Sequence, residues 1–215
     1  MRAIILLAVI AGCSSAPAPD PGSPPASPAP SVTTNAAAIE KARADSLRYP
    51  YTEADVRFMT MMIGHHSQAV QMSKWALTRA ASPAVVRLAE RVINAQQDEI
   101  TTMQQWLLDR QKSVPGVNDT GHAHHMNMPG MLTAAQLTQL EATRGGEFDR
   151  LFLTFMIQHH KGAVEMVKQL FTTAGAAQDL LVFKFANDVQ VDQTTEVARM
   201  EQMLAALTSQ PRNQP

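Results

Sequence analysis

The stretch FMTMMIGHHSQAVQM, residues 58–72, returns as FLTFMIQHHKGAVEM at residues 152–166. Both copies contain the pattern Met-Ile-x-His-His-x-x-Ala-Val-x-Met. Seven of the matched positions run from Asp55 to Met72 and again from Asp149 to Met166, at a constant offset of 94 residues (149 − 55). An internal repeat of this length predicts two copies of one structural unit.

The segments downstream of the two copies also match each other. LAERVINAQQDEITTMQQWL (88–107) aligns with FANDVQVDQTTEVARMEQML (185–204) at an offset of 97 (185 − 88). Apolar residues recur at helical spacing in all four segments, so each unit is predicted to be a helical hairpin. A single hairpin leaves an apolar stripe exposed, and two hairpins can bury theirs together. We therefore expect an all-α fold, a pseudo-symmetric four-helix bundle made of two repeated hairpins.

Turn and capping residues set the expected boundaries. Ser82-Pro83 supplies the start of a second helix, Thr133 with Gln136 forms a capping box for a short helix, and Gly175 ends the third long helix. These signals predict hairpin one at 52–111, a linker at 112–132 and hairpin two at 133–209, within a bundle domain at 36–210. With a net charge of −1 and no clustered Lys or Arg, no nucleic-acid partner is expected.

The N-terminal segment is typical of an exported protein. An apolar run from Ala3 to Ala11 ends at Cys13, and the small residues before this cysteine resemble the lipobox of bacterial lipoproteins. Residues 1–13 are therefore interpreted as a lipoprotein signal peptide, followed by a Pro/Ala/Ser-rich tether at 14–35. A lipidated Cys13 would anchor the chain to a membrane of the cell envelope. The alternative is an ordinary secretory signal with an incidental cysteine.

The inward stripes of the predicted helices mix apolar residues with imidazole, thioether and carboxylate groups. Adjacent His65 and His66 point about 100° apart on a helix. One of them is therefore expected to face the other hairpin and one its own partner helix. Buried polar groups need partners, and a hydrogen-bond network with methionine as filler would satisfy them. The doubled set instead favours a metal site, for which the candidate ligands are Met62, His65, His66, Met72, Glu99, Met103, Met156, His159, His160, Met166, Glu196 and Met200.

The linker segment GHAHHMNMPGM (121–131) repeats the same chemistry outside any helical stripe. Imidazole and thioether groups together suit soft and borderline ions such as copper and silver. The candidate ligands of this second site are His122, His124, His125, Met126, Met128 and Met131. The alternative is a solvated loop whose methionines dock on the bundle.

The doubled motif, MIGHHSQAVQM and MIQHHKGAVEM, resembles the bacterial family called domain of unknown function 305 over about residues 50–208. The resemblance implies a ferritin-like helical bundle in an exported protein. It also implies copper handling through the histidines and methionines of both motifs, with the linker cluster as a further site. In the first helix Met59 and Met61 stand where the second has Leu153 and Phe155, so the halves are expected to differ in affinity.

Copper sequestration or transfer is therefore the predicted function, with Cu(I) as the main ion and Cu(II) or Ag(I) as further ions, in a protein that is not an enzyme. Binding is expected to weaken below about pH 6.5, where histidine becomes protonated. One alternative is a ferritin-like di-metal oxidoreductase, although the Glu-x-x-His motif of such sites does not occur in the sequence. Another is a metal-free interaction module of the cell envelope.

Overall fold

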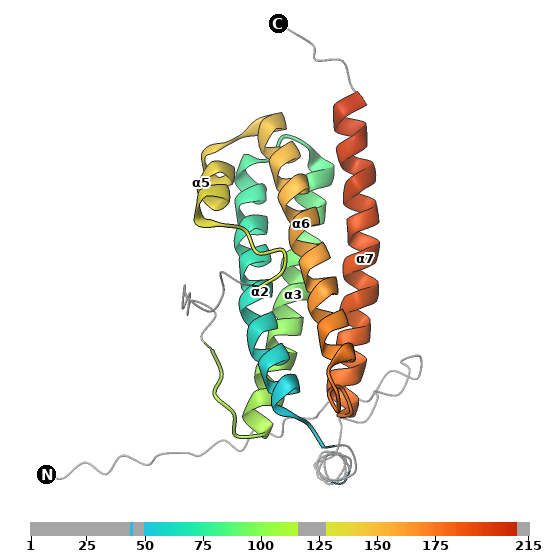
Figure 1. The fold of residues 1–215 in the computed structure, drawn as a ribbon. Helices are drawn as coiled ribbons and strands as arrows, with labels where there is room; N and C mark the ends of the chain where they lie inside the picture. The colour runs from blue at the N-terminus through green and yellow to red at the C-terminus, as the bar shows by residue number, and fades with distance from the viewer. Residues whose placement is uncertain (1–43, 45–49, 116–127, 210–215) are drawn as a thin grey trace, which may run out of the picture. The chain divides into compact units, whose positions relative to one another are not determined.

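The computed structural model describes residue 44 and residues 50–115 and 128–209. Within this part of the chain the structure is all-helical, and the described residues belong to one compact unit (Figure 1). The predicted signal peptide, tether and Cys13 lie outside the described residues, so these expectations stay predictions. The helices are α2 (Glu53–Arg79), α3 (Pro83–Asp109), α5 (Ala134–Ala142), α6 (Gly145–Thr172) and α7 (Leu180–Ser209).

The helix ends follow the capping signals in the sequence. Thr52 and Asp55 form a capping box at the start of α2, and Pro83 occupies the first turn of α3. Thr133 and Gln136 form the predicted capping box of the short helix α5. Between α6 and α7, Gly175 adopts a positive φ of 77°, which a glycine tolerates and most side chains do not.

The long helices pack as two hairpins. Helix α2 packs along α3, α6 packs along α7, and the hairpins meet through α2 and α6 (Figure 1). Helices α3 and α7 make little direct contact with each other. The predicted all-α bundle of two repeated hairpins is confirmed.

Two buried aspartates, one in each hairpin, accept hydrogen bonds from the turn of the other hairpin. Oδ1 of Asp55 accepts a hydrogen bond from the backbone N–H of Ala177 in the α6–α7 turn, at 2.7 Å. Asp149 accepts from the backbone N–H groups of Ala81 and Ser82 in the α2–α3 turn, at 3.1 and 2.8 Å. Burial raises the pKa of Asp149, and these two hydrogen bonds oppose that shift. The carboxylates on the inward stripe at these positions are thus structural.

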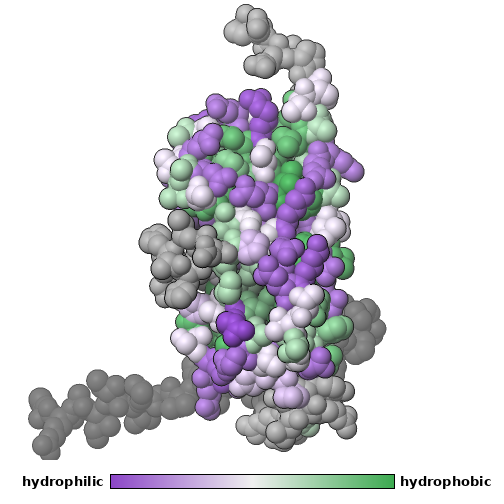
Figure 2. All heavy atoms as spheres, viewed as in Figure 1, coloured by the Kyte–Doolittle hydropathy of each residue, from purple (hydrophilic) through white to green (hydrophobic). Residues whose placement is uncertain are grey.

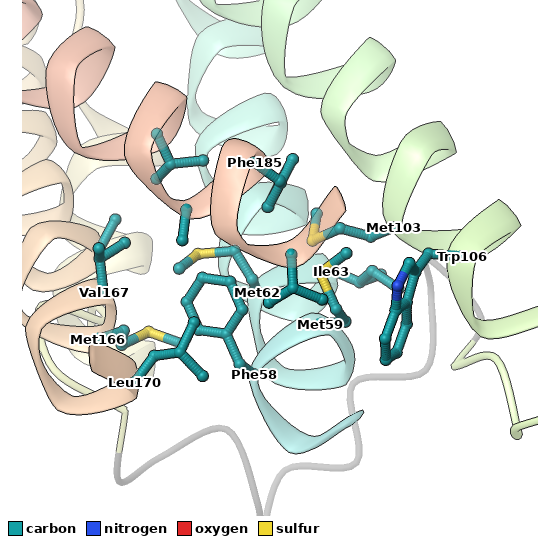
Figure 3. Packing of buried hydrophobic residues seen from close by; sticks show 14 of the residues in the cluster. Phe58, Met59, Met62, Ile63, Met103, Trp106, Met166, Val167, Leu170 and Phe185 are labelled. Atoms are coloured by element: carbon teal, nitrogen blue, oxygen red, sulfur yellow. The ribbon is translucent and has the colours of Figure 1, made fainter. Parts of the chain in front are cut away.

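The core consists of two apolar clusters related by the repeat. The first contains Met62, Met103 and Met166 around Phe58 and Ile63 (Figure 3). The second contains Met156, Met200 and Met72, the repeat counterparts of the first three methionines, and includes Phe148 and Phe152. Each cluster therefore contains three buried methionines at matched repeat positions, and the first cluster also contains Met59 and Met128.

The outer surface mixes polar and apolar residues. On the face shown in Figure 2, hydrophilic and hydrophobic residues are interspersed over the helices. None of the helices in the described part of the chain combines the length and apolar character needed to cross a membrane.

Candidate metal centre

Four buried histidines lie between the two methionine-containing clusters. Along α2, His65 and His66 come between Met62 of the first cluster and Met72 of the second. His159 and His160 occupy the corresponding positions on α6, and all four side chains are buried, with at most 1% of their surface exposed. The repeat therefore places imidazole groups in the middle of the bundle, with thioethers along the helices on both sides.

The inner histidines, His65 and His159, face each other across the junction of the hairpins. Their ring centroids are 3.8 Å apart and their planes are inclined by 38°. Nε2 of His65 donates a hydrogen bond to the backbone carbonyl of Pro129, at 3.0 Å. Both ring nitrogens of His159 are buried without a hydrogen-bond partner among the described residues.

The outer histidines, His66 and His160, turn toward their own partner helices. Nε2 of His66 lies 2.7 Å from Oε2 of Glu99 on α3, and Nε2 of His160 lies 2.7 Å from Oε2 of Glu196 on α7. The glutamate side chains are 19% and 24% exposed, so each pair joins a buried imidazole to a carboxylate at the bundle edge. The predicted split of each histidine doublet is confirmed, because one ring faces the other hairpin and one faces its partner helix.

These hydrogen bonds decide which ring nitrogen is free. A carbonyl or carboxylate oxygen only accepts, so Nε2 carries the proton in His65, His66 and His160. In the neutral ring the lone pair then resides on Nδ1. Nδ1 is buried and has no hydrogen-bond partner in the described structure for any of the four histidines. Orphaned polar atoms of this kind are uncommon in protein interiors and indicate a missing partner.

Burial keeps the inner histidines neutral. Removal from water lowers the pKa of His65 from 6.5 to about 3, and the neighbouring His66 adds to this effect. Burial also holds the pKa of His159 well below 6.5, with His65 as the next largest cause. For the inner pair, protons are therefore expected to compete with a metal only at a pH well below the ordinary pKa of histidine.

The end of the linker, residues 129–132, is held against the bundle next to His65. Gln68 on α2 exchanges two hydrogen bonds with the backbone of Leu132, at 3.2 and 2.8 Å. On α6, a Cβ atom added to Gly162 would lie 2.1 Å from the carbonyl oxygen of Pro129. Gln68 and Gly162 occupy equivalent positions in the repeat (162 − 68 = 94). The first half therefore holds the linker through the side-chain amide of Gln68, and in the second half the linker backbone packs directly against Gly162.

The linker methionines in the described part of the chain pack on the core. Met128 is 4% exposed and belongs to the first apolar cluster, and Met131 packs against the same cluster. For these two side chains, the alternative interpretation, in which the linker methionines dock on the bundle, is confirmed. The other predicted ligands of the linker, His122, His124, His125 and Met126, lie outside the described residues.

The types of buried donor atoms indicate which metals this part of the bundle would suit. Among residues 50–115 and 128–209, no three side chains of the His, Cys, Asp and Glu types are close enough together to hold an ion. The gathered donors are imidazole pairs, and the further donors buried along the same helices are thioethers. This composition fits a soft ion that accepts few ligands better than a carboxylate-bridged di-iron or di-manganese centre.

Comparison with known proteins assigns the chain to a family. The model of the family described as domain of unknown function, DUF305, matches residues 55–204. The chain belongs to the DUF305 family. A DUF305 protein from Streptomyces coelicolor, described as a candidate secreted protein, has a similar structure with a TM-score of 0.63. The two are 27% identical, and the match covers 75% of this chain and 98% of that one.

Another structure similar to this DUF305 chain is that of CopM in its Cu(I)-bound form. It has a TM-score of 0.56 and 28% identity, and the match covers 71% of this chain and 96% of that one. CopM also appears in Cu(II)- and Ag-bound forms, with TM-scores of 0.58 and 0.53. In sequence, the uncharacterized protein L153 of Acanthamoeba polyphaga mimivirus is 41% identical over 58 residues, which span 27% of this chain and 38% of that protein.

Proposed function

We propose that this protein binds copper outside the cytoplasm and sequesters it or passes it on, contributing to copper tolerance. Cu(I) is the expected resident ion, and Cu(II) and Ag(I) are further ions that the same donors accept. The N-terminal segment would direct export, and a lipidated Cys13 would hold the domain at a membrane of the cell envelope. Binding alone accounts for this role, which requires no catalytic group.

The observation that carries the proposal is the state of the histidine nitrogens. In metal centres a ligating histidine usually donates its second ring N–H to a carboxylate or a backbone carbonyl, which fixes its tautomer and orientation. His65, His66 and His160 each make such a bond through Nε2. Their Nδ1 atoms are buried and unpartnered, as they would be if a ligand were expected there. Copper bound at Nδ1 would supply the missing partner.

The thioethers decide which metal the histidines would hold. Met62, Met103 and Met166 lie in one apolar cluster, and their repeat counterparts Met156, Met200 and Met72 lie in the other. Thioether sulfur and neutral imidazole prefer Cu(I) and Ag(I) over hard cations. Copper- and silver-bound CopM, which is similar to this chain over most of its length, supports the same choice.

In this proposal Glu99 and Glu196 act on copper by orienting His66 and His160 and raising the basicity of their rings. The linker residues His122, His124, His125 and Met126 would form a second capture site, next to the docked Met128 and Met131.

The test is an anaerobic Cu(I) titration of the full chain against a chromophoric chelator. A Cys13→Ser background removes the single thiol, which would otherwise compete for Cu(I). One variant carries His65→Gln, His66→Gln, His159→Gln and His160→Gln, which remove the imidazoles but keep side chains of similar size. A matched variant carries His122→Ala, His124→Ala and His125→Ala in the linker.

Tight binding that is lost in the bundle variant and kept in the linker variant is the expected result. Binding that survives in the bundle variant would reduce the four buried histidines to a structural role. Failure of the parent protein to bind Cu(I) would contradict the copper function as a whole. Thermal melting of each variant without copper checks that the bundle still folds.

A further inference from the structure

Four large apolar side chains are exposed at the end of the bundle that contains the α6–α7 turn. Their exposed fractions are 36% for Phe171, 57% for Leu180, 42% for Leu181 and 50% for Phe183. The rings of Phe171 and Phe183 pack edge to face with centroids 5.8 Å apart. Leu180 lies one helical turn before Phe183 on α7. These four residues therefore form one surface, the apolar patch.

The surroundings of the apolar patch carry almost no charge. Residues 169–183 contain a single charged side chain, that of Asp179. It is 3% exposed and forms an ion pair with Arg110, so its charge does not face the solvent. At the opposite end of the bundle, charged residues such as Glu141 and Arg144 are exposed. The two ends of the bundle thus differ in their polarity.

The internal repeat shows that the fold does not require large apolar side chains at these positions. The α2–α3 turn is the counterpart of the α6–α7 turn, at offsets of 94 residues before the turn and 97 after it. The corresponding residues of the first half are all smaller: Leu77, Pro83, Ala84 and Val86. The additional apolar surface of the second half is therefore not explained by the packing of a hairpin turn.

The described part of the chain begins at the same end of the bundle. In Figure 1 the start of α2 and the α6–α7 turn lie together at the lower end of the bundle. Asp55 accepts a hydrogen bond from the backbone N–H of Ala177, and a Cβ atom added to Gly175 would lie 3.9 Å from a methyl carbon of Thr52. Residues 14–49, which connect Cys13 to the domain, therefore join it at the end that carries the apolar patch. A segment of this length keeps the domain within about 120 Å of Cys13 even when fully extended.

We propose that the apolar patch is a membrane-contacting surface, which lies against lipid when Cys13 is anchored in the bilayer. Aromatic and aliphatic side chains without neighbouring charges suit the boundary between lipid headgroups and acyl chains. The anchor keeps lipid at a high local concentration, so a patch of only four side chains can bind it. The inference rests on the anchored Cys13 of the proposed function. It orients the domain with the α6–α7 turn toward the bilayer and the α2–α3 turn away from it.

The test supplies the anchor chemically, through the single cysteine of the chain. The chain that begins at Cys13 is used, because the apolar run at residues 3–11 would itself bind lipid. Cys13 is coupled to a maleimide lipid in vesicles of phosphatidylethanolamine and phosphatidylglycerol, and a chain capped with N-ethylmaleimide is the lipid-free reference. Hydrogen exchange of the backbone amides in residues 171–183 should be slower on the vesicles by about fivefold or more.

A pair of substitutions in the apolar patch tests which side chains cause this slowing. Leu180→Ser combined with Phe183→Ser should abolish it. Leu77→Ser combined with Val191→Ser is the matched control and should keep it, because Leu77 and Val191 are 44% and 63% exposed but lie outside the patch. Equal exchange of the parent with and without vesicles would overturn the inference, and so would slowing that survives in the Leu180→Ser/Phe183→Ser variant. Thermal melting of the capped chains checks that the variants fold.

A second copy of the chain is the competing occupant of the apolar patch. Sedimentation of the capped chain without vesicles should show a monomer. A dimer that dissociates in the Leu180→Ser/Phe183→Ser variant would overturn the membrane contact and assign the patch to self-association.

Two further measurements separate this inference from the proposed function. A Cu(I) titration of the capped chain tests copper binding, and mass spectrometry of the exported protein tests whether Cys13 is acylated. A negative result in either contradicts the proposed function, whereas the exchange experiment still tests the patch because its anchor is supplied chemically. Copper binding and an acylated Cys13 without slower exchange would contradict only the membrane-contacting surface.

Discussion

The inner and outer histidines are adjacent in sequence and equally buried, but they are held in different ways. The rings of His65 and His159 have centroids 3.8 Å apart, and among the described residues the only hydrogen bond of this pair goes to the linker carbonyl of Pro129. His66 and His160 each bond to a glutamate of their own hairpin, at 2.7 Å. The inner pair therefore depends on contacts between hairpins and the outer pair on contacts within them.

If the four histidines form the proposed copper site, this difference separates two tasks within it. The outer rings are oriented by carboxylates whether or not the hairpins are fully packed together. The inner rings are brought together only by the completed bundle, and burial keeps them neutral. On this view the inner pair is a binding element whose unpaired nitrogens cost stability in the metal-free protein.

The largest expected effect that distinguishes the pairs is a pH dependence of the stability. The pKa of His65 is about 3 in the folded chain and 6.5 ordinarily. Between these values the unfolded chain binds the additional proton, so stability is fully present above pH 6.5 and is lost as the pH falls toward 3. For His65 alone the loss is about 5 kcal/mol over this range. Urea denaturation of the metal-free protein at a series of pH values measures it.

A combined His65→Leu and His159→Leu variant should flatten this dependence, because it removes the two histidines whose pKa values burial lowers. An equally steep profile in the variant would show that other groups dominate the acid sensitivity.

A single substitution of an inner histidine should stabilise the metal-free protein. Both ring nitrogens of His159 are buried and unpartnered, so His159→Leu removes an unsatisfied polar group and is expected to raise the free energy of unfolding by about 1–3 kcal/mol. His160→Leu is the matched change in the outer pair. It removes the partner of Glu196 and should be destabilising. A loss of stability with His159→Leu would contradict the view that this ring is kept for binding.

The anchoring of the linker over the inner pair can be disturbed from α6. Gly162→Ala would place Cβ 2.1 Å from the carbonyl oxygen of Pro129 and push the linker away from His65. Overpacking of this kind costs about 1–3 kcal/mol. Gly146→Ala is the control, because a Cβ atom there meets nothing within 4 Å. Thermal melting that gave equal stabilities for the two variants would contradict the close packing of the linker.

The smallest expected effect concerns the outer pair. Glu99→Gln keeps the shape of the side chain but removes the charge that orients His66, so copper affinity should fall by about tenfold. Glu196→Gln should act equally on the other half, and the Cu(I) competition titration measures both. Unchanged affinity in both variants would mean that the outer histidines do not contribute through their carboxylates.

The sequence predicts the helices, the hairpins and the division of each histidine doublet, because all three follow from local periodicity and the 94-residue repeat. It also pairs Glu99 with Glu196 by position. The contacts of Asp55 with Ala177 and of His65 with Pro129 join residues far apart in the chain, and no local pattern indicates them. The repeat has Gln68 in the first half and Gly162 at the equivalent position of the second half. This difference is a sequence signal that could have indicated where the linker is anchored.

The most direct test of the account follows the histidine ring nitrogens by long-range ¹H–¹⁵N NMR while Ag(I) or Cu(I) is added. The metal-free protein should show His65, His66 and His160 protonated at Nε2. Addition of metal should then shift the Nδ1 resonances of the bundle histidines. Metal-induced shifts confined to His122, His124 and His125, with the four bundle rings unchanged, would contradict the claim that the repeated His-His motif forms the copper site.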